Sequence, residues 1–334
     1  MVVRVGVVGT GMIGSDHVDR LSRRVVGSRV SAVFDLATDR AREVAAAVGA
    51  AVAPTALDVI NDPNVDAVVI ASPGDLHAEQ VLACISAGKP VMCEKPLATT
   101  IADCIRVVEA EVAHGARLVQ VGFMRRYDRA FLDVKAAMDD GSIGEPLLAH
   151  AVHRNPSVPD TFVGEMSLTD SLVHEFDAFR WLFGDEIVAT TVVSTRRSPL
   201  GAGQLRDPQI VLIELASGSV VTVESFVHCQ YGYDVRCEVV GTLGTVTLDN
   251  PRTVTTVSNG RRSEPVPADW RVRFAQAYVD ELQTWVDGLS VGVVSGPSAW
   301  DGYAATAVAE SAVASYTRGE RTTVSLVERP WLYR

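Results

Sequence analysis

The sequence predicts an α/β domain built on a doubly wound parallel sheet, followed by an α+β domain with a large, mostly antiparallel open sheet. Three observations predict this. Apolar β-branched runs alternate with helical patterns over the first 121 residues, a G-x-G-x-x-G spacing follows the first run, and strand-like runs succeed one another between residues 187 and 257. We expect the boundary near Gly122, which gives domains 1–121 and 122–334.

Three glycines follow the first predicted strand. They are Gly9, Gly11 and Gly14, and a helical pattern continues from residue 12 to residue 24. The first glycine permits a tight turn, the second lets the backbone approach a pyrophosphate, and the third lets helix and strand pack closely. We expect the backbone N–H groups at Met12 and Ile13 to face the phosphates. The stretch therefore predicts a dinucleotide-binding Rossmann domain.

A carboxylate ends the second predicted strand. This strand covers residues 29–34 and is followed by Asp35, about 20 residues after the last glycine of the motif. A carboxylate at that place accepts hydrogen bonds from the adenosine ribose and repels a 2′-phosphate, so NAD is predicted rather than NADP. The alternative is that Asp35 only begins the turn before a helix over residues 38–48.

Polar residues also follow other strand ends of the first domain. Further strands are predicted over residues 51–53, 65–71, 90–93 and 117–121, with helices between them over residues 55–61, 76–87 and 101–114. Ligands of parallel sheets lie beyond the carboxyl ends of the strands. The candidate cofactor contacts there are therefore Ser72, Pro73, His77, Glu94 and Lys95. The alternatives are a surface lysine in a turn at Lys95 and a solvated or capping histidine at His77.

The second half of the chain is rich in strands. A helix is predicted over residues 127–140, then a strand over residues 146–154 in which Ala149, Ala151, His153 and the following Asn155 share one face. Further strands are predicted over residues 187–196, 208–215, 219–228, 234–240 and 244–248, with no helices between them, which is typical of an antiparallel sheet. Helices return over residues 272–288 and 298–318.

A helical pattern over residues 169–182 places three polar residues on one face. Asp170, His174 and Asp177 recur at i, i+4 and i+7. Histidine titrates near neutral pH, so a histidine held by a carboxylate suits proton transfer. The alternative is an ordinary solvated face. The predicted buried side consists of Leu172, Val173, Phe176, Phe179 and Leu182.

Composition and charge restrict the partners. Of the 334 residues, 47% are hydrophobic and 21% are charged, and the formal net charge is −11. These values suit a soluble globular protein and argue against nucleic acid or an anionic membrane as a partner. The five cysteines form no C-x-x-C pair, so we expect neither a disulfide framework nor a metal site. With no export signal and no apolar stretch that could span a membrane, we expect a cytoplasmic protein.

Together these motifs resemble the family of glucose–fructose oxidoreductase, inositol dehydrogenase and rhizopine-catabolism proteins (Gfo/Idh/MocA). The resemblance covers nearly the whole chain. Within the family, the chain looks most like the inositol 2-dehydrogenases. The motifs that carry it are Gly9-x-Gly11-x-x-Gly14, Ser72-Pro73 with His77, Glu94-Lys95-Pro96, Asp170-x-x-x-His174, and the stretches 121–128 and 153–159.

The resemblance implies NAD-dependent oxidation of a ring hydroxyl of a cyclic polyol. The expected reaction converts myo-inositol to 2-keto-myo-inositol (scyllo-inosose), and D-chiro-inositol is a second candidate substrate. A homotetramer is also implied. The implied catalytic group is Lys95, Asp170 and His174. The implied polyol contacts are Arg125, His153, Asn155, Asp177, Tyr231 and Tyr233.

Some of these assignments have alternatives. The two tyrosines share one face if residues 231–235 are extended, and otherwise they are ordinary aromatic packing. The chain also departs from the family's pattern. Gly74-Asp75 stands where the family often has asparagine after Ser/Thr-Pro, and Ser171 stands where threonine is common in inositol enzymes.

The resemblance also suggests a division of chemical roles. His174 is our expected general base, with Asp170 holding its other ring nitrogen, while Lys95 stabilises developing alkoxide charge. The alternative makes Lys95 the base. We expect no metal. Rival functions are a family enzyme acting on an aldose, another inositol isomer or a methylated inositol, and a ligand-sensing regulator that binds NAD and sugar without turnover.

Overall fold

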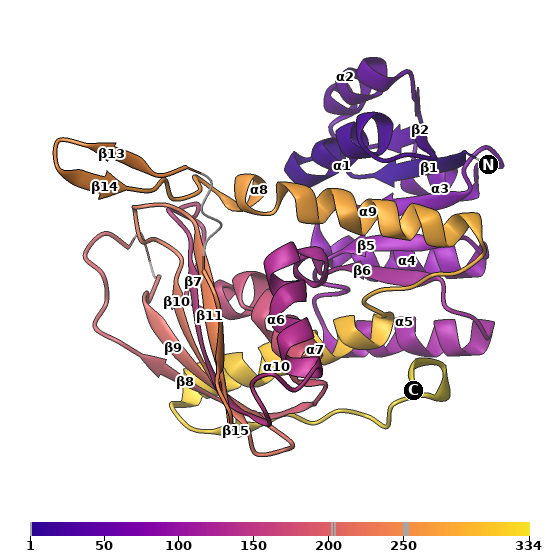
Figure 1. The fold of residues 1–334 in the computed structure, drawn as a ribbon. Coiled ribbons are helices and arrows are strands. Elements are labelled where there is room, and N and C mark those ends of the chain that lie inside the picture. The colour runs from indigo at the N-terminus through magenta and orange to yellow at the C-terminus, as the bar shows by residue number, and fades with distance from the viewer. Residues whose placement is uncertain (1, 202, 204, 250–253) are drawn as a thin grey trace. The chain divides into compact units, whose positions relative to one another are not determined.

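Figure 1 shows the fold as a computed structural model, which describes residues 2–201, 203, 205–249 and 254–334. The chain divides into two compact units. Unit 1 contains the residues up to Met124 together with Tyr278–Thr306 and Leu326–Arg334. Unit 2 contains Arg125–Ala277 and Ala307–Ser325.

Unit 1 holds a six-stranded parallel sheet in the order β3-β2-β1-β4-β5-β6. Its central strands are almost entirely apolar and buried, as expected where helices cover both faces of a sheet. The predicted doubly wound parallel sheet is therefore confirmed. The strands are β1 (Val3–Val8), β2 (Ser28–Phe34), β3 (Ala51–Val52), β4 (Ala67–Ile70), β5 (Val91–Glu94) and β6 (Val119–Gly122).

Helices pack on both faces of this sheet. Leu21 of α1 and Trp285 of α9 share one apolar cluster with Val5 of β1. On the opposite face, a Cβ added at Gly6 of β1 would lie 2.4 Å from Val59 of α3, so strand and helix are in close contact there. The helices of unit 1 are α1 (Met12–Arg23), α2 (Thr38–Val48), α3 (Ala56–Asn61), α4 (His77–Ser86), α5 (Ile101–His114) and α9 (Ala275–Ser290), of which α9 begins in unit 2, with 3-10 turns at Gly74–Leu76 and Trp331–Tyr333.

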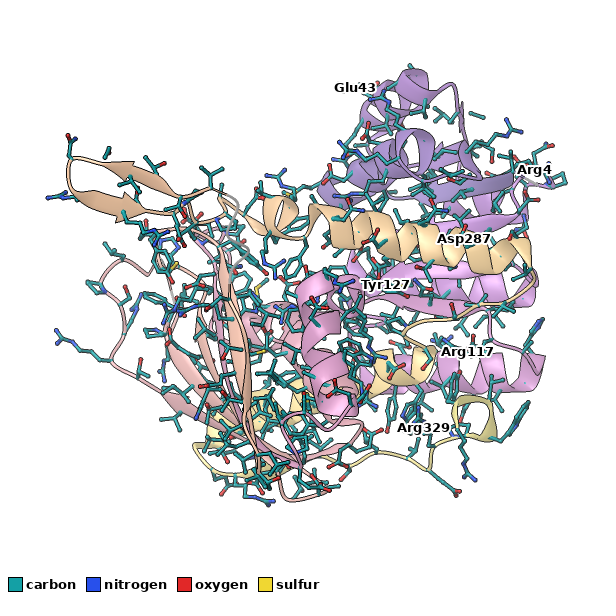
Figure 2. The ribbon with its side chains drawn as sticks, viewed as in Figure 1. Arg4, Glu43, Arg117, Tyr127, Asp287 and Arg329 are labelled. Carbon is teal, nitrogen blue, oxygen red and sulfur yellow. The ribbon has the colours of Figure 1, made fainter. Side chains whose placement is uncertain are left out.

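Segments from the end of the chain belong to unit 1. Arg117, labelled in Figure 2, donates from Nη2 to the carbonyl oxygen of Gly296 (2.9 Å), and Tyr333 donates from Oη to Glu111 Oε2 (2.5 Å). The sequence predicts that residues 278–306 and 326–334 belong to the second domain. They instead group with unit 1, where Leu282 and Trp285 enter its apolar core and Tyr333 binds Glu111.

Unit 2 holds a seven-stranded sheet in the order β12-β11-β7-β10-β9-β8-β15. Only the β7–β10 pair is parallel among these strands, so the predicted mostly antiparallel sheet is confirmed. The strands are β7 (Pro146–Arg154), β8 (Ile187–Ser194), β9 (Gln209–Leu215), β10 (Val220–Phe226), β11 (Asp234–Gly241), β12 (Thr245–Leu248) and β15 (Thr322–Thr323). The separate ribbon β13 (Thr256–Ser258) and β14 (Arg261–Ser263) was not predicted.

One face of this sheet is buried and the other is open. On β7, Ala149, Ala151 and His153 are buried, as the two-residue period predicts, while the intervening residues are partly exposed. On the buried side, Ser315 of α10 accepts the N–H of Val192 at 2.9 Å. The helices are α6 (Arg129–Asp139), α7 (Val173–Phe183), α8 (Trp270–Arg273) and α10 (Ala299–Arg318), of which α10 begins in unit 1.

Two helix predictions need correction. The pattern over residues 169–182 is not one helix, because a π-helical turn, Ser167–Ser171, precedes α7. The pattern over residues 272–288 is divided, since α8 ends at Arg273 and α9 begins at Ala275. A 3-10 turn, Met124–Tyr127, leads into α6. Within the described part of the chain, no helix combines the length and apolar character that crossing a membrane requires.

Candidate active site

The predicted cofactor residues of unit 1 gather at one edge of the parallel sheet. The register pairs Val8 with Phe34 and with Ile70, and it pairs Glu94 with Gly122. Gly9, Asp35, Ser72 and Lys95 follow these strand ends, so they lie along the same carboxyl edge. This is where a doubly wound sheet binds its ligand.

The glycine loop has the shape that a dinucleotide requires. Gly9 has φ +90°, and a Cβ there would lie 2.5 Å from the Ala71 backbone. A Cβ at Gly14 would lie 2.0 Å from the carbonyl oxygen of Gly9, whereas one at Gly11 would meet nothing within 4 Å. The first and third glycines are thus required by close packing, while the second faces open space at the start of α1, where a pyrophosphate fits. Met12 and Ile13 form the first turn of α1.

Asp35 is bound to that loop. Its Oδ2 accepts the Thr10 N–H at 2.7 Å, its Oδ1 accepts the Ala37 N–H at 2.8 Å, and Arg40 Nη2 lies 2.6 Å from Oδ1. Burial raises the pKa of the Asp35 carboxyl, but the hydrogen bonds from Arg40, Thr10 and Ala37 outweigh burial and bring it below its ordinary value. The carboxylate therefore stays ionised beside the glycine loop.

His77 is buried, so the solvated alternative for this residue is wrong. Its Nε2 lies 2.8 Å from the carbonyl oxygen of Ser72, and its Nδ1 lies 2.7 Å from that of Pro96. The imidazole therefore connects the segment after β4 to the segment after β5, the one that contains Lys95.

Glu94 is buried against α1. Its Oε1 lies 2.6 Å from His17 Nε2, and its Oε2 accepts the backbone N–H of Lys95 at 3.3 Å. Burial raises the pKa of the Glu94 carboxyl, but the hydrogen bond and charge of His17 and the charge of Lys95 bring it below its ordinary value. Glu94 thus fixes the backbone next to Lys95.

A buried ionic network occupies unit 2. Glu175 of α7 forms an ion pair with Arg125 and lies 2.9 Å from His153 Nδ1, while His153 Nε2 lies 3.1 Å from Asn155 Oδ1. Burial raises the pKa of the Glu175 carboxyl, but the charges of Arg125 and His153 bring it below its ordinary value. The network holds three predicted polyol residues around one carboxylate.

Two of the residues that follow Arg125 also form arginine–carboxylate ion pairs. Arg126 contacts both carboxylate oxygens of the buried Asp177, at 2.9 and 2.5 Å. Asp128 accepts from both terminal nitrogens of Arg273 on α8, at 2.7 and 3.1 Å. The Arg-Arg-Tyr-Asp stretch therefore joins the start of α6 to α7 and α8.

The helix that carries Asp170 and His174 begins irregularly. Asp170 lies in the π-helical turn and is exposed, whereas His174 and Asp177 are buried on α7. The alternative interpretation, that these residues form an ordinary solvated helix face, is thus wrong for His174 and Asp177. The predicted apolar side of the helix is buried throughout. π-helical turns are rare and are often found at functional sites.

The two tyrosines do not share an environment. Gly232 has φ +143° and β11 begins only at Asp234, so residues 231–233 are not part of a strand and the condition for a common face is not met. Tyr231 is 48% exposed and Tyr233 only 2%. Tyr233 packs edge-to-face on His153 at 5.8 Å, and burial raises its pKa to about 12. Tyr231 instead donates to Asp234 at 2.5 Å and accepts from Arg154 at 2.8 Å.

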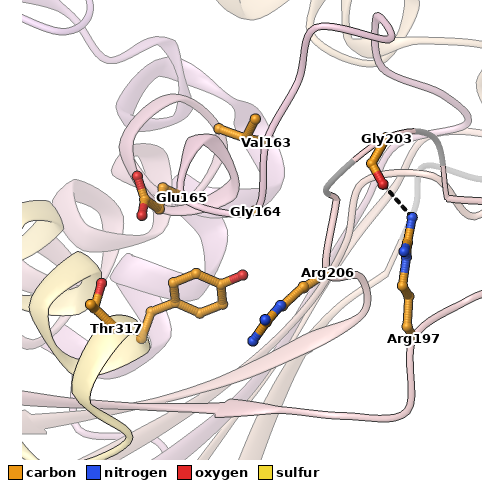
Figure 3. Close-up of a pocket in the computed structure, with 8 residues that line it drawn as sticks. Val163, Gly164, Glu165, Arg197, Gly203, Arg206 and Thr317 are labelled. Carbon is orange, nitrogen blue, oxygen red and sulfur yellow. Dashed lines mark hydrogen bonds between the residues drawn. The ribbon is translucent and has the colours of Figure 1, made fainter.

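Glu175 and Arg126, which hold predicted polyol residues in place, were not predicted from the sequence. The sequence did contain a signal for them. Two consecutive arginines, Arg125 and Arg126, follow apolar residues, and an arginine that becomes buried there needs a carboxylate partner. Among the described residues, no three His, Cys, Asp or Glu side chains gather as a metal site requires. A cavity of about 570 Å³ in unit 2 is lined by none of the predicted residues; it lies beside Val163, Gly164, Glu165, Arg197, Gly203, Arg206, Tyr316 and Thr317 (Figure 3).

A parallel sheet with a glycine loop before the first helix and an ionised carboxylate at the end of the second strand defines the dinucleotide-binding class of proteins. The family described as an oxidoreductase family with an NAD-binding Rossmann fold (Gfo/Idh/MocA) matches residues 3–123, and its C-terminal alpha/beta domain matches residues 135–326. The chain belongs to this family, and its cofactor is NAD.

Relatives cover the chain from end to end. It is 53% identical over 333 residues to inositol 2-dehydrogenase 3 of Saccharopolyspora erythraea, covering 100% of this chain and 98% of that protein. It is 47% identical to inositol 2-dehydrogenase of Pseudomonas fluorescens, covering 100% of both. Among solved structures, myo-inositol dehydrogenase from Lactobacillus casei in complex with NAD(H) and myo-inositol matches with a TM-score of 0.97 and 37% identity, covering 100% of both chains.

Proposed function

We propose that this protein oxidises a ring hydroxyl of a cyclic polyol with NAD, converting myo-inositol to 2-keto-myo-inositol (scyllo-inosose). One observation carries the proposal: the fold matches a myo-inositol dehydrogenase over the whole of both chains, with a TM-score of 0.97. Relatives named inositol 2-dehydrogenase, at 47–53% identity over the whole chain, support the same substrate class.

The residues of unit 1 fit the cofactor. Gly9, Gly11 and Gly14 would hold the pyrophosphate, with the N–H groups of Met12 and Ile13 at the helix start. When bound, NAD supplies the hydride acceptor. The other residues assigned to this site are Asp35 for the ribose and Ser72, Pro73, His77, Glu94 and Lys95 toward the nicotinamide half.

The residues assigned to catalysis are Lys95, Asp170 and His174. His174 accepts the hydroxyl proton at a ring nitrogen, and Asp170 orients the imidazole through the other nitrogen. Lys95 donates a hydrogen bond to the same oxygen and stabilises its developing negative charge. The backbone of Lys95 is fixed for this task by Glu94, and that of Pro96 by His77.

Substrate recognition is assigned to unit 2. Arg125, His153 and Asn155 are held in one hydrogen-bonded group by Glu175, and Asp177 by Arg126, so their positions are set before a polyol binds. An unpaired buried polar group costs about 1–3 kcal/mol, which lets fixed groups discriminate between stereoisomers. Tyr233 belongs beside His153. Tyr231 is the weaker assignment because its hydroxyl is engaged with Asp234 and Arg154.

A screen of NAD reduction tests this function. Initial rates of NADH formation would be measured with myo-, scyllo- and D-chiro-inositol, a methylated inositol and glucose. We expect the highest kcat/KM with myo-inositol and a lower but measurable value with D-chiro-inositol. A higher value with glucose would point to the aldose alternative. Sugar binding without any NADH formation would point to the regulator.

We further propose that the protein is a cytoplasmic homotetramer. The open face of the unit 2 sheet supports this, because it carries the partly exposed apolar residues Val152, Ile210 and Val193, of which Ile210 and Val193 are cross-strand partners. Such a face suits contact with a second copy. Light scattering after size exclusion should give the mass of four chains, and Ile210→Glu should lower it. A monomeric mass for the unaltered protein would contradict the proposal.

A further inference from the structure

The Asp35 carboxylate is fully engaged within the protein. Oδ2 accepts from the backbone N–H of Thr10 at 2.7 Å and from its hydroxyl at 3.0 Å, and Oδ1 accepts from the Ala37 N–H at 2.8 Å. Arg40 adds two more contacts, from Nη2 to Oδ1 at 2.6 Å and from Nε to Oδ2 at 3.3 Å. A carboxylate offers about four lone-pair positions, so ribose hydroxyls can be accepted only where one donor withdraws.

Arg40 is the donor most able to withdraw. The Thr10 and Ala37 N–H groups belong to the backbone of the loops that follow β1 and β2, so moving them would distort the glycine loop or the start of α2. Arg40 reaches Asp35 with a flexible side chain that is 51% exposed. Its loss of hydrogen bonds would be offset by water, because a half-exposed ion pair contributes only about 0–1 kcal/mol.

Helix stability does not explain this arginine. Arg40 lies in the first turn of α2, where the helix dipole disfavours a positive charge. What its position does provide is a guanidinium beside the carboxylate that faces the adenosine ribose. An arginine at that place can bind a 2′-phosphate through a bidentate, charge-assisted pair.

We propose that Arg40 is a specificity-determining residue that yields its place on Asp35 to the ribose and offers its guanidinium to a 2′-phosphate, so that the protein binds NADP as well as NAD. This inference rests on the proposed placement of Asp35 at the ribose. With NAD, the ribose hydroxyls replace the two Arg40 contacts. With NADP, the displaced guanidinium neutralises the phosphate that Asp35 alone would repel.

Binding of NADH and NADPH to the full-length protein tests the proposal without any polyol, so it is independent of the substrate assignment. Dissociation constants would be measured by nucleotide fluorescence for the unaltered protein and for Arg40→Ala. The matched control is Arg42→Ala, because Arg42 lies on the same helix and pairs with Asp39 at an exposed position. Circular dichroism would verify that each variant is folded.

The expected result is selective. Arg40→Ala should weaken NADPH binding about 10- to 100-fold while changing NADH binding less than about threefold, and Arg42→Ala should change neither. Asp35→Ser should strengthen NADPH binding, and adding Arg40→Ala to it should cancel the gain. Equal effects of Arg40→Ala on both nucleotides, or no effect on NADPH, would overturn the proposal. If the unaltered protein bound NADH but not NADPH, the proposal would also fall, and the NAD-dependent function would stand.

Discussion

Replacing Glu175 with glutamine should destabilise unit 2 far more than replacing an exposed carboxylate. Glu175 and Arg125 are both almost fully buried, and Glu175 also lies 2.9 Å from His153 Nδ1. Glutamine keeps the shape but leaves the Arg125 charge without its counterion. Removing one partner of a buried pair costs about 3–5 kcal/mol, which is our expectation for the free energy of unfolding.

The chain offers a matched control on the same unit. Glu214 likewise pairs with an arginine, Arg321, from which it accepts hydrogen bonds at 2.7 and 2.8 Å, but this pair is partly exposed. Glu214→Gln should therefore cost less than about 1 kcal/mol. A double variant, Arg125→Met with Glu175→Gln, should recover part of the loss because no uncompensated charge remains in the interior.

Urea unfolding followed by circular dichroism gives the free energies, and hydrogen exchange locates the effect. Peptides covering α7 should exchange faster in Glu175→Gln, whereas peptides covering α5 in unit 1 should be unchanged. The reasoning would be refuted if Glu175→Gln and Glu214→Gln cost the same free energy. It would also be refuted if the double variant were less stable than Glu175→Gln alone.

Two further predictions concern the loop and a buried acid. Gly14→Ala should lower the melting temperature, because its Cβ would lie 2.0 Å from the Gly9 carbonyl oxygen, whereas Gly11→Ala should leave it unchanged and weaken NADH binding; equal melting temperatures would contradict this. Burial raises the pKa of Asp207 to about 6, so its folded form binds a proton more tightly than its unfolded form, and this contribution to stability is lost as the pH rises through about 6. The unfolding free energy of the unaltered protein minus that of Asp207→Asn should therefore be about 1 kcal/mol larger at pH 5 than at pH 7.5, and a difference independent of pH would contradict it.

Backbone requirements made the cofactor half of the site predictable. A side chain at Gly14 would clash with the Gly9 backbone, and one at Gly9 would clash with the Ala71 backbone at the end of β4. Glycine is therefore required at both positions, and the order of strand, glycines and helix in the sequence reveals it. Asp35 follows from the same local logic. The side-chain partners of this edge were not predictable, because His17 and Glu94 are 77 residues apart and meet only after the sheet has formed.

Helical periodicity failed on α7 for a physical reason. An amphipathic pattern assumes one solvated face, but Glu175 and Asp177 are about 200° apart around the helix and both are buried. What neutralises them, Arg125 and Arg126, comes from a segment about fifty residues earlier. The π-helical turn before Leu172 contains one more residue in each hydrogen-bonded turn than an α-helix, and a pattern based on 3.6 residues per turn does not reveal it.

The hairpin turn between β13 and β14 could have been predicted from the sequence. Asn259 and Gly260 both have positive φ, 52° and 70°, between β13 and β14. Asn-Gly is a strong signal for a tight hairpin turn. It was missed because the flanking strands are only three residues long, polar and exposed, so they lack the apolar alternation by which strands are usually identified.

The most direct measurement of the central claim is the rate of NADH formation from myo-inositol by Lys95→Ala and His174→Ala. We predict that kcat falls at least about 100-fold in each, because one removes the group that stabilises the alkoxide and the other removes the base. NADH should still bind to His174→Ala. The control variants Lys135→Ala and His114→Ala, on α6 and α5, should keep the unaltered rate. A kcat within about threefold of the unaltered value for Lys95→Ala or His174→Ala would contradict the account.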